Sequence, residues 1–434
     1  MAFRLTLARS YWLKLHLYLA LSVGALFALI GLTGSLSVYG ENLDRLFNPR
    51  LVIRPAGQSL SLDTLMAAVR ARHPDNRGAW TLELPRAPDQ PLTAWYEKPI
   101  ESVGQFYAPL MVAVNPYTGE ILASRLWGDT LRTWLRDWHT RLNLGRWGSP
   151  IVGMLGLCLM VSAVSGLYLW WPGIAGLRAR WGLRTDAGLQ RFSLDLHRWL
   201  GLLVFPLLLL QALTGFNLSF PSVGEALVGT QDMGHGDNGP EIRSTGLPSA
   251  NRPVSLDEAV LLARGPFPRS PVRLLTTPAD AQGTYRVAFQ QPMEPSDRHP
   301  MTVVWVDQYS GQIREVRNAA RFSSGERLLT TLWPLHTGGL VGSIGKLLWF
   351  LTGLALPVLY VTGLIRWLIG RGAIPDRPVD VRPVQQWLTR NGQRAGVAIG
   401  RVYSVARPGL ERAWTVAATQ LRALWAMLRQ RLQI

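Results

Sequence analysis

Four long apolar runs constrain the fold of this chain more than any other feature. They are residues 15–39, 150–171, 199–220 and 347–368. Each run is long enough to cross a hydrocarbon layer of about 30 Å, which takes about 20 helical residues. Of the 434 residues, 48% are hydrophobic and only 17% are charged, a balance typical of membrane proteins. We therefore expect an α-helical integral membrane protein with a four-helix transmembrane bundle.

The net charge of +17 is distributed in a way that indicates membrane topology rather than nucleic-acid binding. Basic residues gather before the first run, between the second and third runs, and after residue 380. This pattern predicts cytoplasmic N- and C-termini, with the long segments 42–130 and 221–328 outside. The first apolar run is too long for a cleavable signal peptide and is not followed by an A-x-A site, so we expect an uncleaved signal anchor.

Several classes of redox cofactor are excluded by the sequence. The single cysteine, Cys158, permits no intramolecular disulfide, no cysteine-ligated iron–sulfur cluster and no covalently attached haem. No G-x-G-x-x-G opens a βαβ unit, and the segment 342–346 lacks the first glycine of a phosphate-binding loop, so no nucleotide domain is expected. Electrons for any redox reaction would have to come from a quinol or a separate reductase.

One histidine introduces each of the four apolar runs. They are His16, His139, His197 and His336. The first and third share L-H-x-[YW]-L and reach a Leu-Thr-Gly whose threonine lies 17 positions further on (33−16 and 214−197). The second and fourth are followed by glycines at +6 and +9 and by V-[ST]-G-L-x-x-W, which ends 31 positions further on (170−139 and 367−336). This alternating order predicts an internal duplication.

The two segments between the spans also resemble each other. Each contains Ser-Leu-Asp, beginning at Ser61 and at Ser255, which is expected to open a helix; the N-cap of the first helix is expected to be Ser59 or Ser61. Alternating patterns then predict strands, over residues 79–84, 92–96 and 110–114 in the first segment. Both segments contain V-[ND]-x-Y-[ST]-G-[EQ]-I, which is typical of a hairpin turn. We predict two α+β modules, each with one helix and three or four antiparallel strands.

The directions of the spans bring the histidines to two levels of the bundle. His16 and His197 are expected near the cytoplasmic boundary, and His139 and His336 near the external one. Ionisable side chains in a membrane bundle are costly and usually functional. Imidazoles from separate helices are a common way to ligate the iron of b-type haem. Two histidine pairs, one at each surface, are therefore predicted.

Other features have simpler interpretations. A straight helix from His139 to Gly166 would be about 40 Å long, so a break is expected near Gly148 and Pro150. The Thr-Gly and Ser-Gly pairs are explained most simply by close packing of helices. His235, in an external loop, is expected to be solvated, and the arginine-rich tail is expected to form an amphipathic helix on the inner membrane surface.

Together, these patterns resemble the PepSY-associated transmembrane proteins of bacterial inner membranes, some of which are similar to ferric-siderophore reductases. The resemblance covers roughly residues 10–370 and rests on the four spans, their histidines and the two hairpin motifs. It implies that two haem b groups have their iron ligated by the four histidines listed above. It also implies electron transfer from a quinol or a cytoplasmic reductase to a ferric siderophore or another ferric chelate bound by PepSY-like modules. It identifies no catalytic residue.

Two alternatives to haem chemistry are open from the residues alone. The histidines would also suit binding or transport of a transition metal such as zinc or copper, or the modules would bind a peptide or protease partner in a membrane regulator. The expected organisation is a first transmembrane helix over 1–40, a module over 41–130, interfacial and second transmembrane helices over 131–172, a cytoplasmic link over 173–190, a third transmembrane helix over 191–220, a second module over 221–328, interfacial and fourth transmembrane helices over 329–370, and a basic tail over 371–434.

Overall fold

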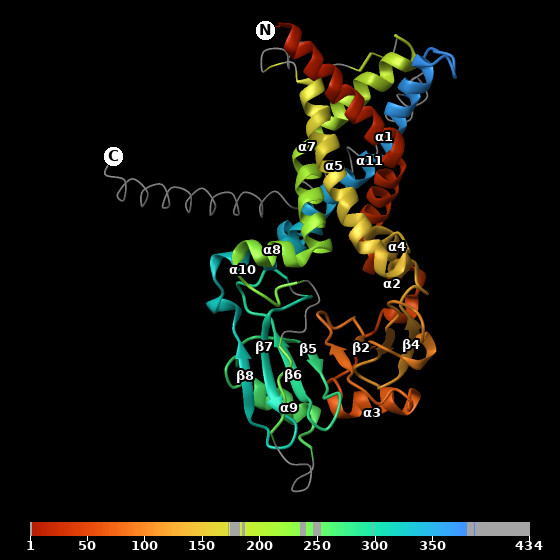
Figure 1. The fold of residues 1–434 in the computed structure, drawn as a ribbon. Coiled ribbons are helices and arrows are strands. Elements are labelled where there is room, and N and C mark those ends of the chain that lie inside the picture. Colours follow the sequence, from red (N-terminus) through yellow and green to blue (C-terminus); the bar gives the residue numbers. More distant parts are fainter. Residues whose placement is uncertain are drawn as a thin grey trace, which may run out of the picture. The chain divides into compact units, whose positions relative to one another are not determined.

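The computed structural model (Figure 1) describes residues 2–171, 173, 183–184, 187–234, 240–245, 253–296, 298–379 and 386. Its contacts divide the chain into two units: Met1–Trp181 with Ser193–Trp367, and Gly182–Phe192 with Leu368–Ile434. In the second unit, the backbone N–H of Leu189 donates to the carbonyl oxygen of Arg377 (2.8 Å). His235 and almost all of the predicted amphipathic tail lie outside the described residues.

Four helices of the described residues are long and apolar enough to cross a membrane, as the sequence predicts. They are α1 (Ala2–Val38), α5 (Gly148–Trp170), α7 (Gly188–Ser219) and α11 (Gly342–Gly370). Pro206 and Pro357 lie inside α7 and α11; a packed bundle tolerates such prolines because neighbouring groups satisfy the freed backbone. The chain is therefore a multi-pass integral membrane protein.

A short helix precedes two of the spans, and the predicted break separates the two elements. The helix α4 (Leu131–Arg141) is followed by η3 (Gly145–Trp147) and then α5; α10 (Ser324–His336) is followed by η5 (Gly339–Val341) and then α11. Gly145 and Gly342 have φ angles of +55° and +62°, a region that favours glycine. A side chain at Gly148 would overlap the backbone of Arg141. The +6 and +9 glycines of the sequence pattern thus form the tight turn between each short helix and its span.

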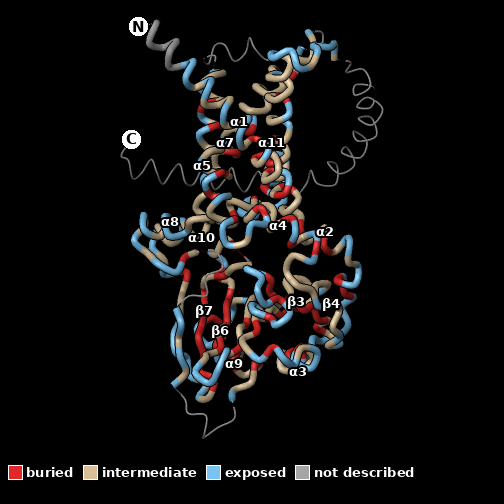
Figure 2. Tube along the Cα trace, turned by 45° about the vertical axis from the view of Figure 1, so that its right-hand side comes forward, coloured by how far each residue is buried: buried red, intermediate tan, exposed pale blue. Residues whose placement is uncertain are grey.

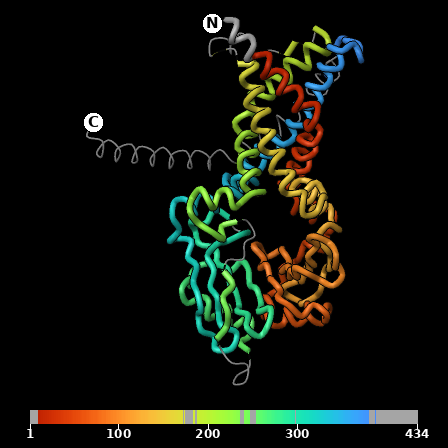
Figure 3. The backbone as a smooth tube through the Cα atoms, viewed as in Figure 1, coloured from red at the N-terminus to blue at the C-terminus, as the bar shows by residue number. Residues whose placement is uncertain are grey.

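The two modules form one continuous antiparallel sheet, which the sequence analysis did not predict. The strand order is β4-β3-β2-β1-β5-β6-β7-β8. The strands are β1 (Thr81–Glu83), β2 (Leu92–Tyr96), β3 (Leu110–Val114), β4 (Ile121–Leu126), β5 (Val272–Thr276), β6 (Thr284–Phe289), β7 (Thr302–Asp307) and β8 (Ile313–Arg317). Strands β1 and β5 pair directly, with Leu82 opposite Leu275, although they come from distant parts of the sequence (Figure 3).

Two helices complete the modules and cap each other. They are α3 (Leu62–Arg72), capped by Ser61 rather than by the alternative Ser59, and α9 (Leu256–Ala263), capped by Ser255. The carboxylate of Asp257 accepts from the N–H groups of Leu62 and Asp63 (both 3.1 Å). The carboxylate of Asp63 accepts in return from the N–H groups of Leu256 (3.0 Å) and Asp257 (3.2 Å). Each acidic side chain therefore satisfies free N–H groups in the first turn of the other helix.

A single apolar core runs through both modules. It includes Leu82 and Val112 of the first module and Leu275 and Val287 of the second, all at most 1% exposed. Figure 2 shows these buried residues along the strands. The remaining short elements are α2 (Gly40–Phe47), α8 (Pro221–Val228), η1 (Pro49–Leu51), η2 (Ile100–Ser102) and η4 (Ala319–Arg321).

Candidate functional site

Each of the four histidines lies against a Ser-Gly or Thr-Gly pair on a different helix. The contacts are His16 with Gly166, His139 with Gly34, His197 with Gly363, and His336 with Gly215. A Cβ atom at these glycines would lie 3.0, 2.5, 3.4 and 3.1 Å, respectively, from Cε1 of the imidazole. Each of these glycines thus makes room for a histidine ring from a neighbouring helix, a role that the helix-packing interpretation did not include.

The Nδ1 atom of each imidazole is held by a hydrogen bond to the same helix that carries the glycine. The acceptors are the carbonyl oxygens of Ser162 for His16 (3.0 Å), Ile30 for His139 (2.9 Å) and Leu359 for His197 (2.9 Å), and Oγ1 of Thr214 for His336 (2.9 Å). Each of these three carbonyl groups belongs to the residue four positions before the glycine. Because the glycine has no side chain, the imidazole can approach closely enough to donate to that carbonyl. With Nδ1 as donor, Nε2 has a free lone pair that can ligate a metal.

The hydroxyl residue that precedes each glycine is buried and bonds to its own helix. Oγ1 of Thr33 donates to the carbonyl of Leu29 (2.7 Å), and Oγ1 of Thr214 donates to the carbonyl of Leu210 (2.7 Å). Because the Thr214 hydroxyl uses its proton in this way, it accepts the hydrogen bond from His336. The Ser-Gly and Thr-Gly pairs therefore fix both the position and the orientation of the imidazoles.

The structure brings the histidines together in two pairs. The ring centroids of His16 and His197 are 6.2 Å apart with an interplanar angle of 89°, and those of His139 and His336 are 5.9 Å apart at 32°. Two imidazoles on opposite sides of one metal ion would have centroids roughly 6 Å apart, from two metal–nitrogen bonds of roughly 2 Å each and roughly 1 Å from each nitrogen to its ring centre. Both separations thus fit bis-histidine ligation.

A cavity of about 490 Å³ surrounds the His16–His197 pair. This volume lies within the range of roughly 300–1,000 Å³ that is usual for cofactor sites. Ala20 and Gly201, one helical turn after each histidine, line the cavity and leave space beside the rings. Its lining is mostly apolar, with three basic residues: Arg9, Arg198 and Arg366. The site thus has the volume and the lining of a pocket for a mostly apolar group with charged edges.

The His139–His336 pair lies on the short helices α4 and α10, outside the spans. Burial lowers the pKa of His336 to about 3, with a further contribution from His139. Burial likewise lowers the pKa of His139. Both imidazoles are therefore neutral at physiological pH, which is the form that coordinates a metal. Nowhere in the described residues do three or more His, Cys, Asp or Glu side chains gather as a metal site.

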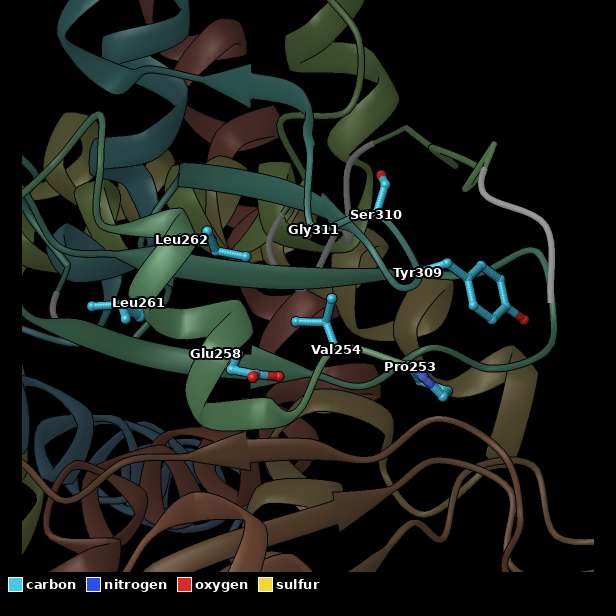
Figure 4. A pocket seen from close by; sticks show the side chains of 8 residues that line it. All are labelled: Pro253, Val254, Glu258, Leu261, Leu262, Tyr309, Ser310 and Gly311. Atoms are coloured by element: carbon cyan, nitrogen blue, oxygen red, sulfur yellow. The ribbon is translucent and has the colours of Figure 1, made fainter. Parts of the chain in front are cut away.

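A second cavity lies in the second module, and two of the polar side chains that line it already form hydrogen bonds within the protein (Figure 4). It has a volume of about 440 Å³ and lies between α9 and the turn after β7. The carboxylate of Glu258 already accepts from the backbone N–H of Ser255 (2.8 Å), and the hydroxyl of Tyr309 donates to Ala281 (3.1 Å). The motif at this turn forms the predicted hairpin between β7 and β8, with Gly311 at a φ angle of +69°.

Four apolar helices, one histidine pair between two of them and a second pair on the short helices α4 and α10 define a multi-pass membrane protein with two candidate metal or haem sites. The sequence profile of the PepSY-associated TM region matches residues 13–369, which is most of the chain. The chain belongs to this family. A search among curated proteins finds no match.

Proposed function

We propose that this protein is a haem b protein of the bacterial inner membrane that passes electrons across the bilayer to ferric chelates. The observation that carries this proposal is the presence of two histidine pairs with centroid separations of 6.2 and 5.9 Å. In this proposal, His16 and His197 ligate the iron of one haem, and His139 and His336 ligate the iron of the other. When bound, haem supplies a one-electron Fe(III)/Fe(II) couple.

The basic segments indicate on which side of the membrane each histidine pair lies. Placed in the cytoplasm by the positive-inside rule, they put the His16–His197 pair near the inner surface. The His139–His336 pair is then near the outer surface, on the short helices that connect the sheet to the spans. Because the sequence has no nucleotide-binding motif, we infer that the donor is a quinol or a separate cytoplasmic reductase.

The side chains around each pair position the ligands. The Nδ1 hydrogen bonds orient the rings before any metal binds, which lowers the cost of binding. Burial keeps His139 and His336 neutral, so they ligate iron without first losing a proton. The mostly apolar lining around His16 and His197 limits access of water to that pair.

The overall reaction balances with two ferric ions for each quinol. A quinol loses two electrons and two protons, and each electron reduces one chelated Fe(III) to Fe(II). Because siderophores bind Fe(II) far less tightly than Fe(III), the iron is then released. We infer that the two halves of the chain, with their shared order of helices and strands, arose by duplication and provide one site for each side of the membrane.

Anaerobic rapid mixing tests this function. Haem-loaded protein, reduced with dithionite and freed of excess reductant, is mixed with ferric citrate or a ferric hydroxamate. We expect reoxidation of the b-type absorption bands, with formation of Fe(II) trapped by ferrozine. The His139→Ala/His336→Ala double variant should lose most of this reaction with added chelate. If no ferric chelate reoxidises the protein, it is not a ferric reductase.

A further inference from the structure

A line of basic residues leads away from the second histidine pair along α4. Arg132, Arg136 and His139 are spaced i, i+4 and i+7, so they share one face of the helix. The guanidinium of Arg136 lies over the ring of Trp333, 4.6 Å from its centroid. Trp333 is three residues before His336 on α10. Arg136 therefore lies beside both helices that carry the pair.

Loops from both modules bring further basic residues close to Arg136. His299, in the segment between β6 and β7, packs edge-on against Trp333 with centroids 5.5 Å apart. Its neighbour Arg298 forms an ion pair with Glu41. Arg86, which follows β1, lies 3.7 Å from the same Glu41 carboxylate and also pairs with Glu83. We call Arg86, Arg132, Arg136 and Arg298 the arginine cluster.

Two arginines of the cluster lack an acidic partner among the described residues. Within the part of the chain that the structure describes, neither Arg132 nor Arg136 forms an ion pair. The nearby Asp137 is already engaged by Arg141 (3.1 Å) and by the indole N–H of Trp127 (2.9 Å). Like charges held together in a partly buried site destabilise the protein until an anion binds.

The pKa values of these groups are lowered mainly by burial, and two of them also by neighbouring charges. Desolvation, followed by the charge of Arg132, lowers the pKa of Arg136 to about 10. Desolvation also lowers the pKa of Arg298 to about 10. The pKa of His299 falls to about 3, through desolvation first and then through Arg136, Arg298 and Arg86. At neutral pH the arginines remain charged, and His299 remains a neutral hydrogen-bonding group.

We propose that the arginine cluster binds the carboxylates of an anionic ferric chelate and holds it beside the His139–His336 pair. Guanidinium groups bind carboxylates through two parallel hydrogen bonds, and the stacking on Trp333 fixes the plane of Arg136. The inference rests on the proposed function and narrows its substrate class to carboxylate-bearing chelates. A cationic or neutral chelate would gain nothing from the cluster.

Gallium(III) citrate allows the inference to be tested apart from electron transfer, because Ga(III) is not reduced. Its binding to the full-length protein in nanodiscs is measured by calorimetry and compared with that of the cationic gallium complex of desferrioxamine B. We expect Arg136→Gln to weaken citrate binding by about tenfold or more, and Arg132→Gln to act in the same direction. Neither change should affect the cationic complex. Arg264→Gln, an equal charge change at an exposed residue after α9, should leave both affinities unchanged.

The arginine cluster could instead bind the propionate carboxylates of the porphyrin. The haem content of the variants distinguishes this role from binding of the chelate. If Arg136→Gln removes haem but leaves the affinity for gallium citrate unchanged, the guanidinium serves the porphyrin and the inference is wrong. Equal affinities of wild type, Arg136→Gln and Arg132→Gln for gallium citrate would also overturn it. If the protein takes up no haem but still binds gallium citrate in an arginine-dependent way, the chelate site is supported and the proposed electron transfer is contradicted.

Discussion

Gly34 of α1 faces the imidazole of His139 so closely that a methyl group at this glycine would lie 2.5 Å from Cε1 of the ring. Real contacts of this kind are longer, so Gly34→Ala must displace the imidazole or the helix. We expect the variant to lose haem from the His139–His336 site, with an affinity lower by about 10- to 100-fold. Haem content and the b-type spectrum of the purified protein measure this loss.

Gly363 provides the matched control for that substitution. It occupies the equivalent position opposite His197, but its Cβ would lie 3.4 Å from Cε1, an ordinary van der Waals distance. Gly363→Ala should therefore bind haem almost as wild type does. If both alanine variants lose haem equally, or neither does, contact between glycine and imidazole is not what shapes these sites.

A second prediction concerns the hydrogen bond to His336. Thr214→Val removes the hydroxyl that accepts from Nδ1 at 2.9 Å, whereas Thr33→Val leaves the bond from His139 to the carbonyl of Ile30 in place. Both threonines precede a histidine-facing glycine of the same pair. We expect Thr214→Val to weaken haem binding by up to about tenfold and Thr33→Val to have a smaller effect. Equal haem titration curves for the two variants would argue against this role of the hydroxyl.

The reciprocal caps of α3 and α9 predict coupling between the modules. Asp63→Ala removes the acceptor for two N–H groups at the start of α9, a loss of about 1 kcal/mol. Asp63→Asn keeps a side-chain oxygen and should cost less. Hydrogen exchange at the first turn of α9 should be faster in the alanine variant than in the asparagine variant. Unchanged exchange in Asp63→Ala would show that the cap contributes little.

The buried His299 predicts a loss of stability in mild acid. Its pKa is about 3 in the folded protein, against an ordinary value of 6.5. Between these values the unfolded chain binds more protons, so stability falls as the pH drops below about 6.5. The melting temperature of His299→Gln should therefore decrease less than that of wild type between pH 7 and pH 5. Parallel decreases in the two proteins would contradict a neutral, buried His299.

Much of the fold follows from local patterns in the sequence. The four spans, the starts of the helices after Ser61 and Ser255 and the break after α4 depend on nearby residues, and all were predicted. The pairing of β1 with β5 was not, because it joins strands almost 200 positions apart, and strand patterns do not identify partners at that distance. The reciprocal Asp63–Asp257 caps depend on this pairing and were missed with it.

At the site, the sequence indicated which residues matter but not how they are held. The four histidines stand out through their matched spacing, and span direction suffices to group them in two levels. The Ser-Gly and Thr-Gly pairs are visible in the sequence, but the pattern alone favours helix packing, since small residues have that role in most membrane helices. Only coordinates reveal that each glycine faces an imidazole from another helix. The arginine cluster was also missed, because it combines two loops and one helix face.

The reduced-minus-oxidised spectrum of the purified protein tests the central claim most directly. With ample haem during expression, we expect b-type bands from two haems per chain. The His16→Ala/His197→Ala and His139→Ala/His336→Ala double variants should each lose about one of the two, as the two separate ring pairs require. A folded wild-type protein without haem bands, or double variants with the full spectrum, would contradict haem ligation by these pairs.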